Sequence, residues 1–235
     1  MSQHECSIDR ALDWALLTDF YELTMMQGYL RQRHNPRAVF EMFFRRAPFG
    51  GGFAVFAGLE TLLSAIRELR FGDEDLAYLE AQGVFGREFL DYLEAFRFSG
   101  DIHAVDEGTI VFPNEPLIRV EAPLIEAQLL ESLLLNIVNF QTLIATKAAR
   151  IWLASREGEV LEFGMRRAQG VNGALAASRA AYIGGVSATS NTLAGRLYGI
   201  PVRGTMAHSW VMAFGSELEA FQKYAEVYPD GCVLL

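Results

Sequence analysis

The chain contains very little cysteine. Its 235 residues include two, Cys6 and Cys232, which lie near opposite ends and match neither a disulfide framework nor the spacing of a zinc site. Unpaired thiols are typical of proteins kept in a reducing compartment, so we expect a cytoplasmic protein. A chain of this length buries enough surface to form a stable core without covalent cross-links.

Positive charge is also scarce. Lysine and arginine number 20 against 29 aspartates and glutamates, and the formal net charge is −9. The sequence has no block of lysine and arginine that could follow a nucleic-acid backbone, which argues against nucleic-acid binding. An acidic protein can still bind anionic metabolites, but it then needs a local group of cationic and hydrogen-bonding side chains.

Long uninterrupted apolar runs are missing as well. The apolar stretch Leu129–Val138 is interrupted by Glu131, Ser132 and Asn136, so we expect no membrane-spanning segment and no membrane partner. Residues 1–10 carry charges and no apolar run, from which we expect no secretory signal.

The first two thirds of the chain mix helical patterns with short strands. The expected helices cover residues 13–30, 58–69, 73–81 and 86–96. The expected strands cover residues 38–45, 101–105, 109–112 and 117–121. Thr18 or Asp19 is the expected N-cap of the first helix, with Glu22 completing a capping box. Residues 122–154 have apolar residues at helical spacing and predict one long helix, or two joined near 136–139. We therefore predict an α+β domain over residues 1–156.

The pattern changes after residue 156. From here the chain repeats a short apolar segment, a polar glycine-containing loop and an amphipathic helix. The apolar segments begin at residues 160, 184, 202 and 232, the spacing of βα units in a parallel sheet or barrel. We predict that residues 157–235 form the first part of an incomplete α/β barrel. Because the sequence stops inside the fourth predicted strand, we expect the natural polypeptide to continue past Leu235.

Three loops of this second region carry the candidate functional residues. In parallel α/β folds, the loops that follow the carboxyl ends of the strands form the active face. The loops are 163–170, 187–191 and 205–209. Their candidate side chains are Phe163, Met165, Arg166, Arg167, Ser190, Asn191, His208 and Ser209. Guanidinium groups suit carboxylates and phosphates, and hydroxyls and helix N–H groups add contacts to an anion.

Each of these side chains has a simpler interpretation when taken alone. Surface ion pairs with Glu162 or Glu157 would account for Arg166 and Arg167. Helix capping or core packing would account for Ser190, Asn191, His208 and, in the first helix, Tyr21. The placement of arginines, hydroxyls and a histidine on the same side of consecutive βα units favours a binding site.

Five segments together resemble the nicotinate phosphoribosyltransferase family. They are LLTDFYELTMMQGYL at 16–30, PFGGGFAVFAGLE at 48–60, EFGMRRAQG at 162–170, TSNTLAGRLYGIPVRGTMAHSW at 189–210 and VLL at 233–235. They follow the family's order and extend over nearly all of the chain. The resemblance implies a type II phosphoribosyltransferase fold, in which an N-terminal α+β domain precedes an irregular α/β barrel. It also implies a homodimer whose active sites are shared between subunits.

The resemblance further implies a reaction. It is the transfer of a phosphoribosyl group from phosphoribosyl pyrophosphate to nicotinate in NAD biosynthesis, coupled to ATP hydrolysis through a phosphohistidine. Mg²⁺ would be bound to the pyrophosphate rather than to a dedicated protein site.

The residues that would bind the pyridine ring follow from the same resemblance. Tyr21 would reach across the dimer and stack on one face of the ring, with Phe163 on the other. Arg166 would contact the carboxylate of nicotinate or the neighbouring phosphates. Met165 would line the pocket.

The resemblance assigns four further residues. His208 would accept the phosphoryl group of ATP, and Ser209 would lie beside the substrate. Ser190 or Asn191 stands where nicotinamide-using relatives carry an aspartate. A fixed carboxylate there would repel nicotinate, whereas serine or asparagine would not, which favours the acid over the amide.

Alternatives stay open on the sequence alone. The base could be nicotinamide or quinolinate, although quinolinate calls for more positive charge than Arg166 and Arg167 provide. The chain could also be a non-catalytic metabolite-binding or scaffold protein. In the family, an acidic loop, a further arginine and a glycine-rich phosphate loop follow the strand at 232. These are not in the sequence, so we expect residues 1–235 alone to lack the phosphoribosyl half of the site. A reading frame that continues past Leu235 would favour the enzyme.

Overall fold

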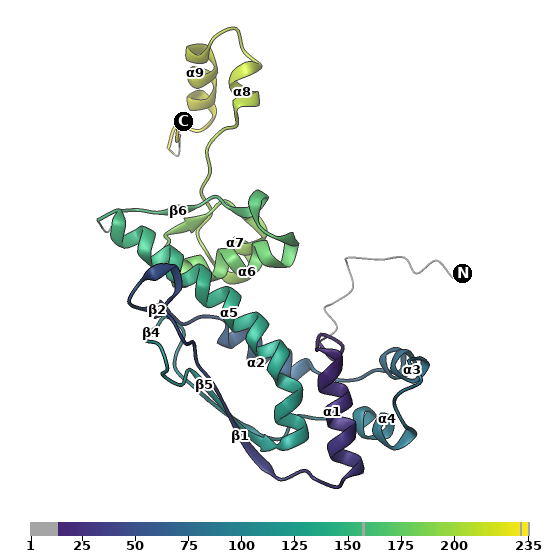
Figure 1. Cartoon of the computed structure of the whole chain (residues 1–235). Coiled ribbons are helices and arrows are strands. Elements are labelled where there is room, and N and C mark those ends of the chain that lie inside the picture. The colour runs from purple at the N-terminus through teal and green to yellow at the C-terminus, as the bar shows by residue number, and fades with distance from the viewer. Residues whose placement is uncertain (1–13, 157, 231, 235) are drawn as a thin grey trace. The chain divides into compact units, whose positions relative to one another are not determined.

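A computed structural model describes residues 14–156, 158–230 and 232–234 (Figure 1). The chain forms two compact units, residues 1–146 and 147–235. The division falls inside a long helix, α5 (Leu124–Ala154), whereas the change in sequence pattern that suggested a boundary at residue 156 follows the end of this helix.

The first unit contains a three-stranded antiparallel sheet and a two-stranded one. The larger sheet has the order β1 (Arg37–Met42), β5 (Ile118–Pro123) and β3 (Asp101–Ala104), and the smaller pairs β2 (Ala54–Val55) with β4 (Ile110–Val111). In β5 every second residue is buried, namely Ile118, Val120 and Ala122. Such alternation is typical of a strand with one face against a core, and it confirms the strands predicted there.

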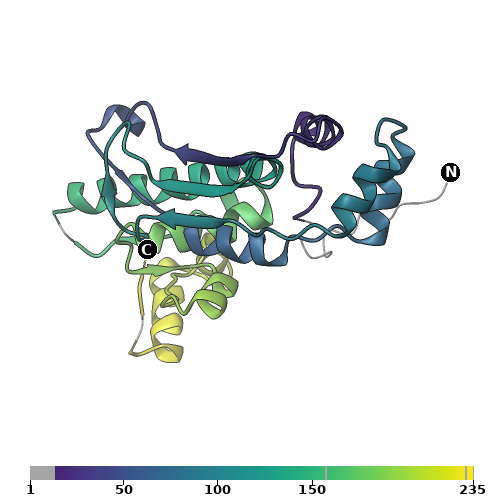
Figure 2. The same ribbon diagram turned by 90° about the horizontal axis from the view of Figure 1, so that it is seen from below.

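Helices make up the rest of this unit. They are α1 (Phe20–Arg31), α2 (Leu59–Glu68), α3 (Asp73–Ala81), α4 (Arg87–Glu94) and the first part of α5, with a short 3₁₀ turn, η1 (Pro48–Gly50). Figure 2 shows the same elements from below. The prediction that the first helix begins at residue 13 was wrong, because α1 begins at Phe20.

The expected capping box of α1 is not formed. Asp19 occupies the N-cap position, but its side chain makes no capping hydrogen bond. Instead its carboxylate accepts a hydrogen bond of 2.5 Å from the hydroxyl of Ser132 on α5. Glu22 points into the protein and is fully buried. Tertiary contacts with α5 have therefore taken both acidic side chains away from the helix end.

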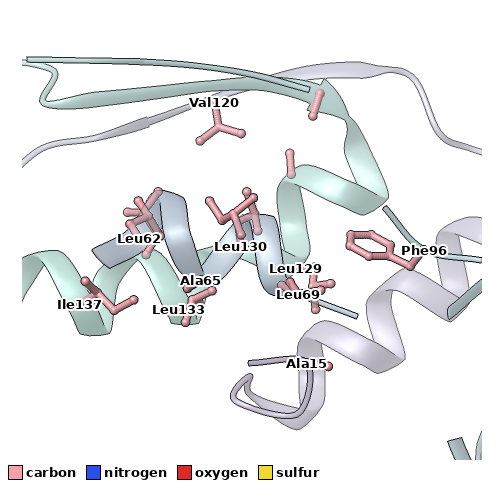
Figure 3. Close-up of a cluster of buried hydrophobic side chains, with 14 of the residues drawn as sticks. Ala15, Leu62, Ala65, Leu69, Phe96, Val120, Leu129, Leu130, Leu133 and Ile137 are labelled. Carbon is pink, nitrogen blue, oxygen red and sulfur yellow. The ribbon is translucent and has the colours of Figure 1, made fainter. Parts of the chain in front are cut away.

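The core of the first unit lies around α5, which is one continuous helix. Figure 3 shows Leu130 and Leu133 of α5 in one cluster with Leu62 of α2 and Val120 of β5. All four side chains are at most 3% exposed. Burial of a leucine side chain contributes about 1.5–3 kcal/mol, so this cluster is a main source of stability for the unit.

Polar residues of α5 also hold the segment 54–58 against the helix. The amide of Val55 donates to the hydroxyl of Thr146 at 2.9 Å, and the amide of Ala57 donates to Thr142 at 3.2 Å. Gly58 has φ 110°, and a Cβ there would lie 3.2 Å from the Cα of Val138. Only glycine combines this backbone conformation with so close an approach, so the FAVFAGLE segment is fitted to the helix.

By length and composition alone, α5 could cross a membrane. The interruptions in its apolar runs had led us to expect no segment of this kind. An 18-residue window of the helix reaches a mean hydropathy of 1.4, and 56% of that window is buried inside the protein. Because these buried side chains pack in the core described above, the protein interior accounts for the apolar character of the helix.

The second unit contains parallel βα elements. Its elements are β6 (Leu161–Glu162), the 3₁₀ turn η2 (Met165–Arg167), α6 (Gly170–Ile183), β7 (Ala188–Thr189), α7 (Thr192–Tyr198), α8 (His208–Met212) and α9 (Glu217–Val227). Strands β6 and β7 pair in parallel, as the βα spacing predicted, and Val202 forms a single parallel bridge with Thr189.

Two of the predicted strands of this region were misplaced. Residues 184–186 follow α6 and close its last turn, because the amides of Gly184, Gly185 and Val186 donate to carbonyls of residues 180–182. The strand therefore begins later, at Ala188. Of the predicted fourth strand, the described residues 232–234 lie outside any strand, and Cys232 has a free, half-buried thiol. Cys6 lies outside the described residues.

The buried Glu22 makes the stability of the first unit depend on pH. Its carboxylate accepts a hydrogen bond of 2.5 Å from Gln128, whose amide group also donates to Glu131 at 3.1 Å. Burial raises the pKa of Glu22, and the hydrogen bond from Gln128 only partly opposes this effect. The folded protein therefore binds the proton of Glu22 more tightly than the unfolded chain does.

We predict that Glu22→Gln flattens the pH dependence of stability. A carboxyl group with a raised pKa stabilises the fold fully at low pH. This contribution is lost as the pH rises from the unfolded value, about 4.3, through the folded pKa. Urea unfolding from about pH 4 to pH 8 should therefore show a smaller decline for Glu22→Gln than for the unmodified protein. Glu60→Gln, at an exposed position of α2, is the control. Parallel profiles for Glu22→Gln and the unmodified protein would contradict the prediction.

Candidate active site

The carboxyl ends of β6 and β7 lie side by side at one edge of the second unit. Leu161 is opposite Ala188 and Glu162 is opposite Thr189 in the parallel ladder. Parallel strands send the loops at their carboxyl ends to the same edge. The structure therefore brings the start of the loop 163–169 next to residues 190–191, as the sequence predicted.

The loop 163–169 presents its side chains outward. Its centre is the turn η2, in which the amide of Arg167 donates to the carbonyl of Gly164 at 2.9 Å. Phe163 is 41% exposed and Met165 is 46% exposed. Large apolar side chains exposed beside a charged group are typical of a site that binds a ring with a polar substituent.

The two arginines of this loop keep their charge available. Both are exposed, and neither forms an ion pair with any other residue that the structure describes. The surface pair with Glu162 is not formed, because that carboxylate accepts hydrogen bonds from other groups. Glu157, the other proposed partner, lies outside the described residues. The guanidinium groups can therefore receive an anionic ligand.

Ser190 and Asn191 have different environments. Asn191 is 3% exposed. Its Oδ1 caps α7 by accepting from the amide of Ala194 at 3.2 Å, and its Nδ2 donates to Ser178 at 3.3 Å. The simpler interpretation of Asn191 as a helix cap is thus confirmed. Ser190 is half-buried, so its side chain is the more accessible of the two.

His208 and Ser209 are the first two residues of α8, close to the helix start that the sequence predicted. Both side chains are exposed. The helix packs against α9, where the indole Nε1 of Trp210 donates to the carbonyl of Ala220 at 2.9 Å. These two residues therefore belong to a helical pair, and neither forms a hydrogen bond to the loop 163–169 as far as the structure describes it.

Tyr21 belongs to the first unit and lies on the surface. It is 47% exposed, and its hydroxyl donates to Glu131 of α5 at 3.2 Å. Hydrogen bonding and charge repulsion from Glu22, and to a smaller extent from Glu131, raise the pKa of the tyrosine hydroxyl. The ring borders an open groove of about 640 Å³ between the start of α1 and α5. The groove is lined by Leu17, Thr18, Asp19, Tyr21, Glu131, Ser132, Leu135, Asn136, Asn139, Phe140 and Leu143. The interpretation of Tyr21 as a core residue was therefore wrong.

Sequence reasoning missed the residues that support these positions. Glu131 accepts a hydrogen bond from Tyr21, and Ser132 donates one to Asp19. In the sequence, Glu131 and Ser132 appear only as interruptions of an apolar run. Ser178 bonds to Glu162 and Asn191. A polar residue inside an apolar helix was the signal that could have found them, since buried polar groups need partners.

The described residues contain no group of three or more histidine, cysteine, aspartate or glutamate side chains that could hold a metal ion. The exposed charged groups of the loop 163–169 are the guanidinium groups of Arg166 and Arg167, which do not bind metal ions. Their chemistry is that of an anion site.

Solved structures define the class of fold. Human nicotinic acid phosphoribosyltransferase superimposes with a TM-score of 0.78 at 45% identity, over 85% of this chain and 41% of that one. A nicotinate-nucleotide pyrophosphorylase from Pyrococcus furiosus gives 0.79 over 100% of this chain and 52% of that one. Its 21% identity supports the fold alone. The chain has the type II phosphoribosyltransferase fold, with an N-terminal α+β domain followed by α/β elements.

Sequence comparisons define the family. The family model of the nicotinate phosphoribosyltransferase N-terminal domain matches residues 16–139. Nicotinate phosphoribosyltransferases of Mycobacterium tuberculosis and Bacillus subtilis are 47% and 50% identical, each over 94% of this chain. The chain belongs to the nicotinate phosphoribosyltransferase family. It spans 48% and 45% of the length of these two relatives.

Proposed function

We propose that the protein containing these residues transfers a phosphoribosyl group from phosphoribosyl pyrophosphate to nicotinate, in the synthesis of NAD in the cytoplasm. The observation that carries the proposal is the pairing of an exposed aromatic ring, Phe163, with an unpaired guanidinium, Arg166, on one loop at the edge of parallel strands. Family membership supports it, because the relatives at 47% and 50% identity are named for this reaction. Nicotinate is an aromatic ring with one carboxylate, which matches the two side chains.

The choice of the acid over the amide rests on charge. Arg166 attracts a carboxylate, and Ser190 at the neighbouring strand end has no charge to repel it. Because Asn191 is committed to capping α7, we assign the role of facing the base to Ser190. Met165, exposed on the same loop, lines the pocket.

The chemistry is a displacement at the anomeric carbon. The ring nitrogen of nicotinate supplies the electron pair for the new C–N bond, and the C–O bond to pyrophosphate breaks with its electrons on the leaving group. Phe163 and Arg166 hold the base in place, so this half of the site acts by positioning and electrostatics. Mg²⁺ enters bound to pyrophosphate. The described residues offer no cluster for it, so we assign it no ligand in this chain.

We predict that Arg166→Ala weakens nicotinate binding by about 1.5–3 kcal/mol, the range for a hydrogen bond to a charged group. Nicotinamide binding should change much less, because the amide carries no charge. The measurement is calorimetric titration of both ligands into the polypeptide of the complete reading frame that contains these residues. Arg196→Ala, at an exposed position of α7, is the matched control. Equal losses for the two ligands would show that Arg166 does not read the carboxylate.

We propose that the active unit is a homodimer in which Tyr21 acts on the partner's site. The proposal is supported by the half-exposed ring of Tyr21, which its hydrogen bond to Glu131 fixes at an open groove of the first unit. A tyrosine held in this way offers an exposed ring face to a ligand bound by the partner subunit.

We predict that mixed dimers of Tyr21→Ala and Arg166→Ala subunits recover activity. Each mixed dimer carries one intact site if the two residues act on the same base from different subunits. The rate of nicotinate mononucleotide formation should therefore rise when the two inactive variants are co-expressed. Co-expression of two differently tagged Tyr21→Ala subunits, which cannot rebuild a site, shows the effect of mixing alone. Mixed dimers demonstrated by mass spectrometry that stay inactive would refute the shared site.

We propose that ATP hydrolysis is coupled to the reaction through phosphorylation of His208, with Ser209 beside the substrate. The exposed imidazole at the start of α8 supports this proposal, since a neutral ring nitrogen is a nucleophile for the γ-phosphate. The electron pair of that nitrogen forms the N–P bond, and ADP leaves.

We predict an acid-labile phosphate on His208. With γ-labelled ATP and Mg²⁺, the label should appear on this residue in the polypeptide of the complete reading frame. His208→Ala should lose both the label and the ATPase activity, and retain slow synthesis without ATP. His103→Ala, in β3 of the first unit, is the control. Label that persists in His208→Ala would exclude this residue as the acceptor.

A further inference from the structure

Glu162 joins four segments of the second unit. It is the last residue of β6, and its main-chain carbonyl accepts from the amide of Ser190 at 2.9 Å. One carboxylate oxygen, Oε2, accepts from the hydroxyls of Thr189 at 2.6 Å and Ser178 at 3.0 Å. The other, Oε1, accepts from the amide of Gly164. One side chain therefore connects β6, β7, α6 and the first residues of the loop that carries Arg166.

Two partners of Glu162, Ser178 and Thr189, are buried and continue the network, and each is 1% exposed. Thr189 Oγ1 accepts from the amide of Asn191 at 3.0 Å, and Ser178 Oγ accepts from Asn191 Nδ2 at 3.3 Å. Each hydroxyl has a single proton. Thr189 gives its proton to Glu162, whereas the proton of Ser178 is shared between Glu162 and the carbonyl of Ala174, which is also 3.0 Å away. The lone pairs of both hydroxyls are left for Asn191.

The direction of this network depends on an acceptor at position 162. The carboxylate oxygens accept, so they orient the buried hydroxyl of Thr189 and, through it, the amide of Asn191, the residue that caps α7. Without them, the amide of Gly164 and the hydroxyl of Thr189 would each lose a partner. Leaving the buried hydroxyl of Thr189 unsatisfied is costly, so the loop and the turn would rearrange.

The same carboxylate determines where the loop begins. Gly164 contributes the carbonyl that closes η2, in which Arg166 lies. A Cβ at Gly164 would lie only 2.9 Å from Glu162 Oε1, so a side chain at position 164 would displace this carboxylate. The position of the Glu162 carboxylate therefore sets the position of the turn that presents Arg166.

We infer that Glu162 is a positioning residue of the base site. It does not touch nicotinate. It fixes the loop 163–167 and the residues 189–191 in one arrangement, so that Phe163, Arg166 and Ser190 face the same ligand. Its two oxygens accept hydrogen bonds from the protein, which offset part of its repulsion of the nicotinate carboxylate. This inference rests on the proposed function.

The inference is tested by kinetics on the polypeptide of the complete reading frame. Glu162→Ala should raise the KM for nicotinate by about 10- to 100-fold. This is the range measured in metal sites when a residue that hydrogen-bonds to a ligand side chain, and so orients it, is removed. The preference for nicotinate over nicotinamide should fall with it. The KM for phosphoribosyl pyrophosphate should stay unchanged, which a general loss of structure would not allow. Glu162→Gln keeps one acceptor and should restore part of the preference. Glu159→Ala, an exposed glutamate of the same unit, is the matched control.

Two further measurements separate positioning from a structural role. If Glu162 acts through Arg166, the double variant Arg166→Ala/Glu162→Ala should show no further loss of preference beyond Arg166→Ala alone. Gly164→Ala should reproduce the effect of Glu162→Ala, since it displaces the same carboxylate. Hydrogen exchange at the amide of Gly164 should be fast in Glu162→Ala and slow in Glu162→Gln.

The outcomes distinguish this inference from the proposed function. An unmodified protein with no preference for nicotinate would overturn both, and this result does not involve position 162. A clear preference that Glu162→Ala and Gly164→Ala retain would overturn only the positioning role. Should Glu162→Ala fail to fold, Gly164→Ala and Glu162→Gln decide the question. The same two quantities are measured for them: the KM for nicotinate and the preference for nicotinate over nicotinamide.

Discussion

The parallel pairing of β6 with β7 is the constraint on which the candidate site depends. Each strand contributes two residues to the ladder, and parallel pairing is somewhat weaker per residue than antiparallel pairing. So short a ladder does little by itself to hold two loops in register. The hydrogen bonds of Glu162 with Gly164, Ser178 and Thr189 supply the missing restraint from side chains. The site is thus held by a buried polar network, which has to be complete to be stable.

Side-chain hydrogen bonds also hold a surface segment in place in the first unit. Its stability comes from the apolar side of α5, but Glu131 and Ser132 of that helix form hydrogen bonds to Tyr21 and Asp19. These bonds hold the start of α1 at the edge of an open groove and replace the helix cap that the sequence suggested. A tyrosine kept half-exposed by a carboxylate has a lower entropy cost when it binds a ligand than a freely rotating one. In both units, exposed side chains that we propose to bind ligands are therefore held by hydrogen-bonded supports.

The sequence predicted most of the elements because their signals are local. Alternation revealed β5, helical spacing revealed α5, and glycine-containing turns separated them. The errors arose where tertiary contacts override local preference. Asp19 looked like an N-cap but bonds to Ser132, more than a hundred residues away. The residues predicted as a strand at 184–186 instead follow α6 and bond to its last turn, because apolar residues after a helix do not show where its hydrogen bonds end.

The residues of the candidate site could be proposed from the sequence, but the side chains that hold them in place could not. Arg166 and Phe163 follow a strand, and their expected place on the same side as residues 190–191 favoured a binding site. The roles of Glu162 and Ser178 depend on side-chain directions that no spacing reveals. For Asn191, the sequence left two roles open, and burial with a hydrogen bond to Ala194 favours the cap.

The most direct test of the account is a crystal structure of the polypeptide of the complete reading frame with nicotinate. We predict that the pyridine ring lies against Phe163, with its carboxylate about 2.7–2.9 Å from the guanidinium nitrogens of Arg166, the range for charge-assisted hydrogen bonds. The carboxylate of Glu162 should remain bonded to Gly164, Ser178 and Thr189 and make no contact with the ligand. Nicotinate bound at another place, or an Arg166 turned away from its carboxylate, would contradict the account.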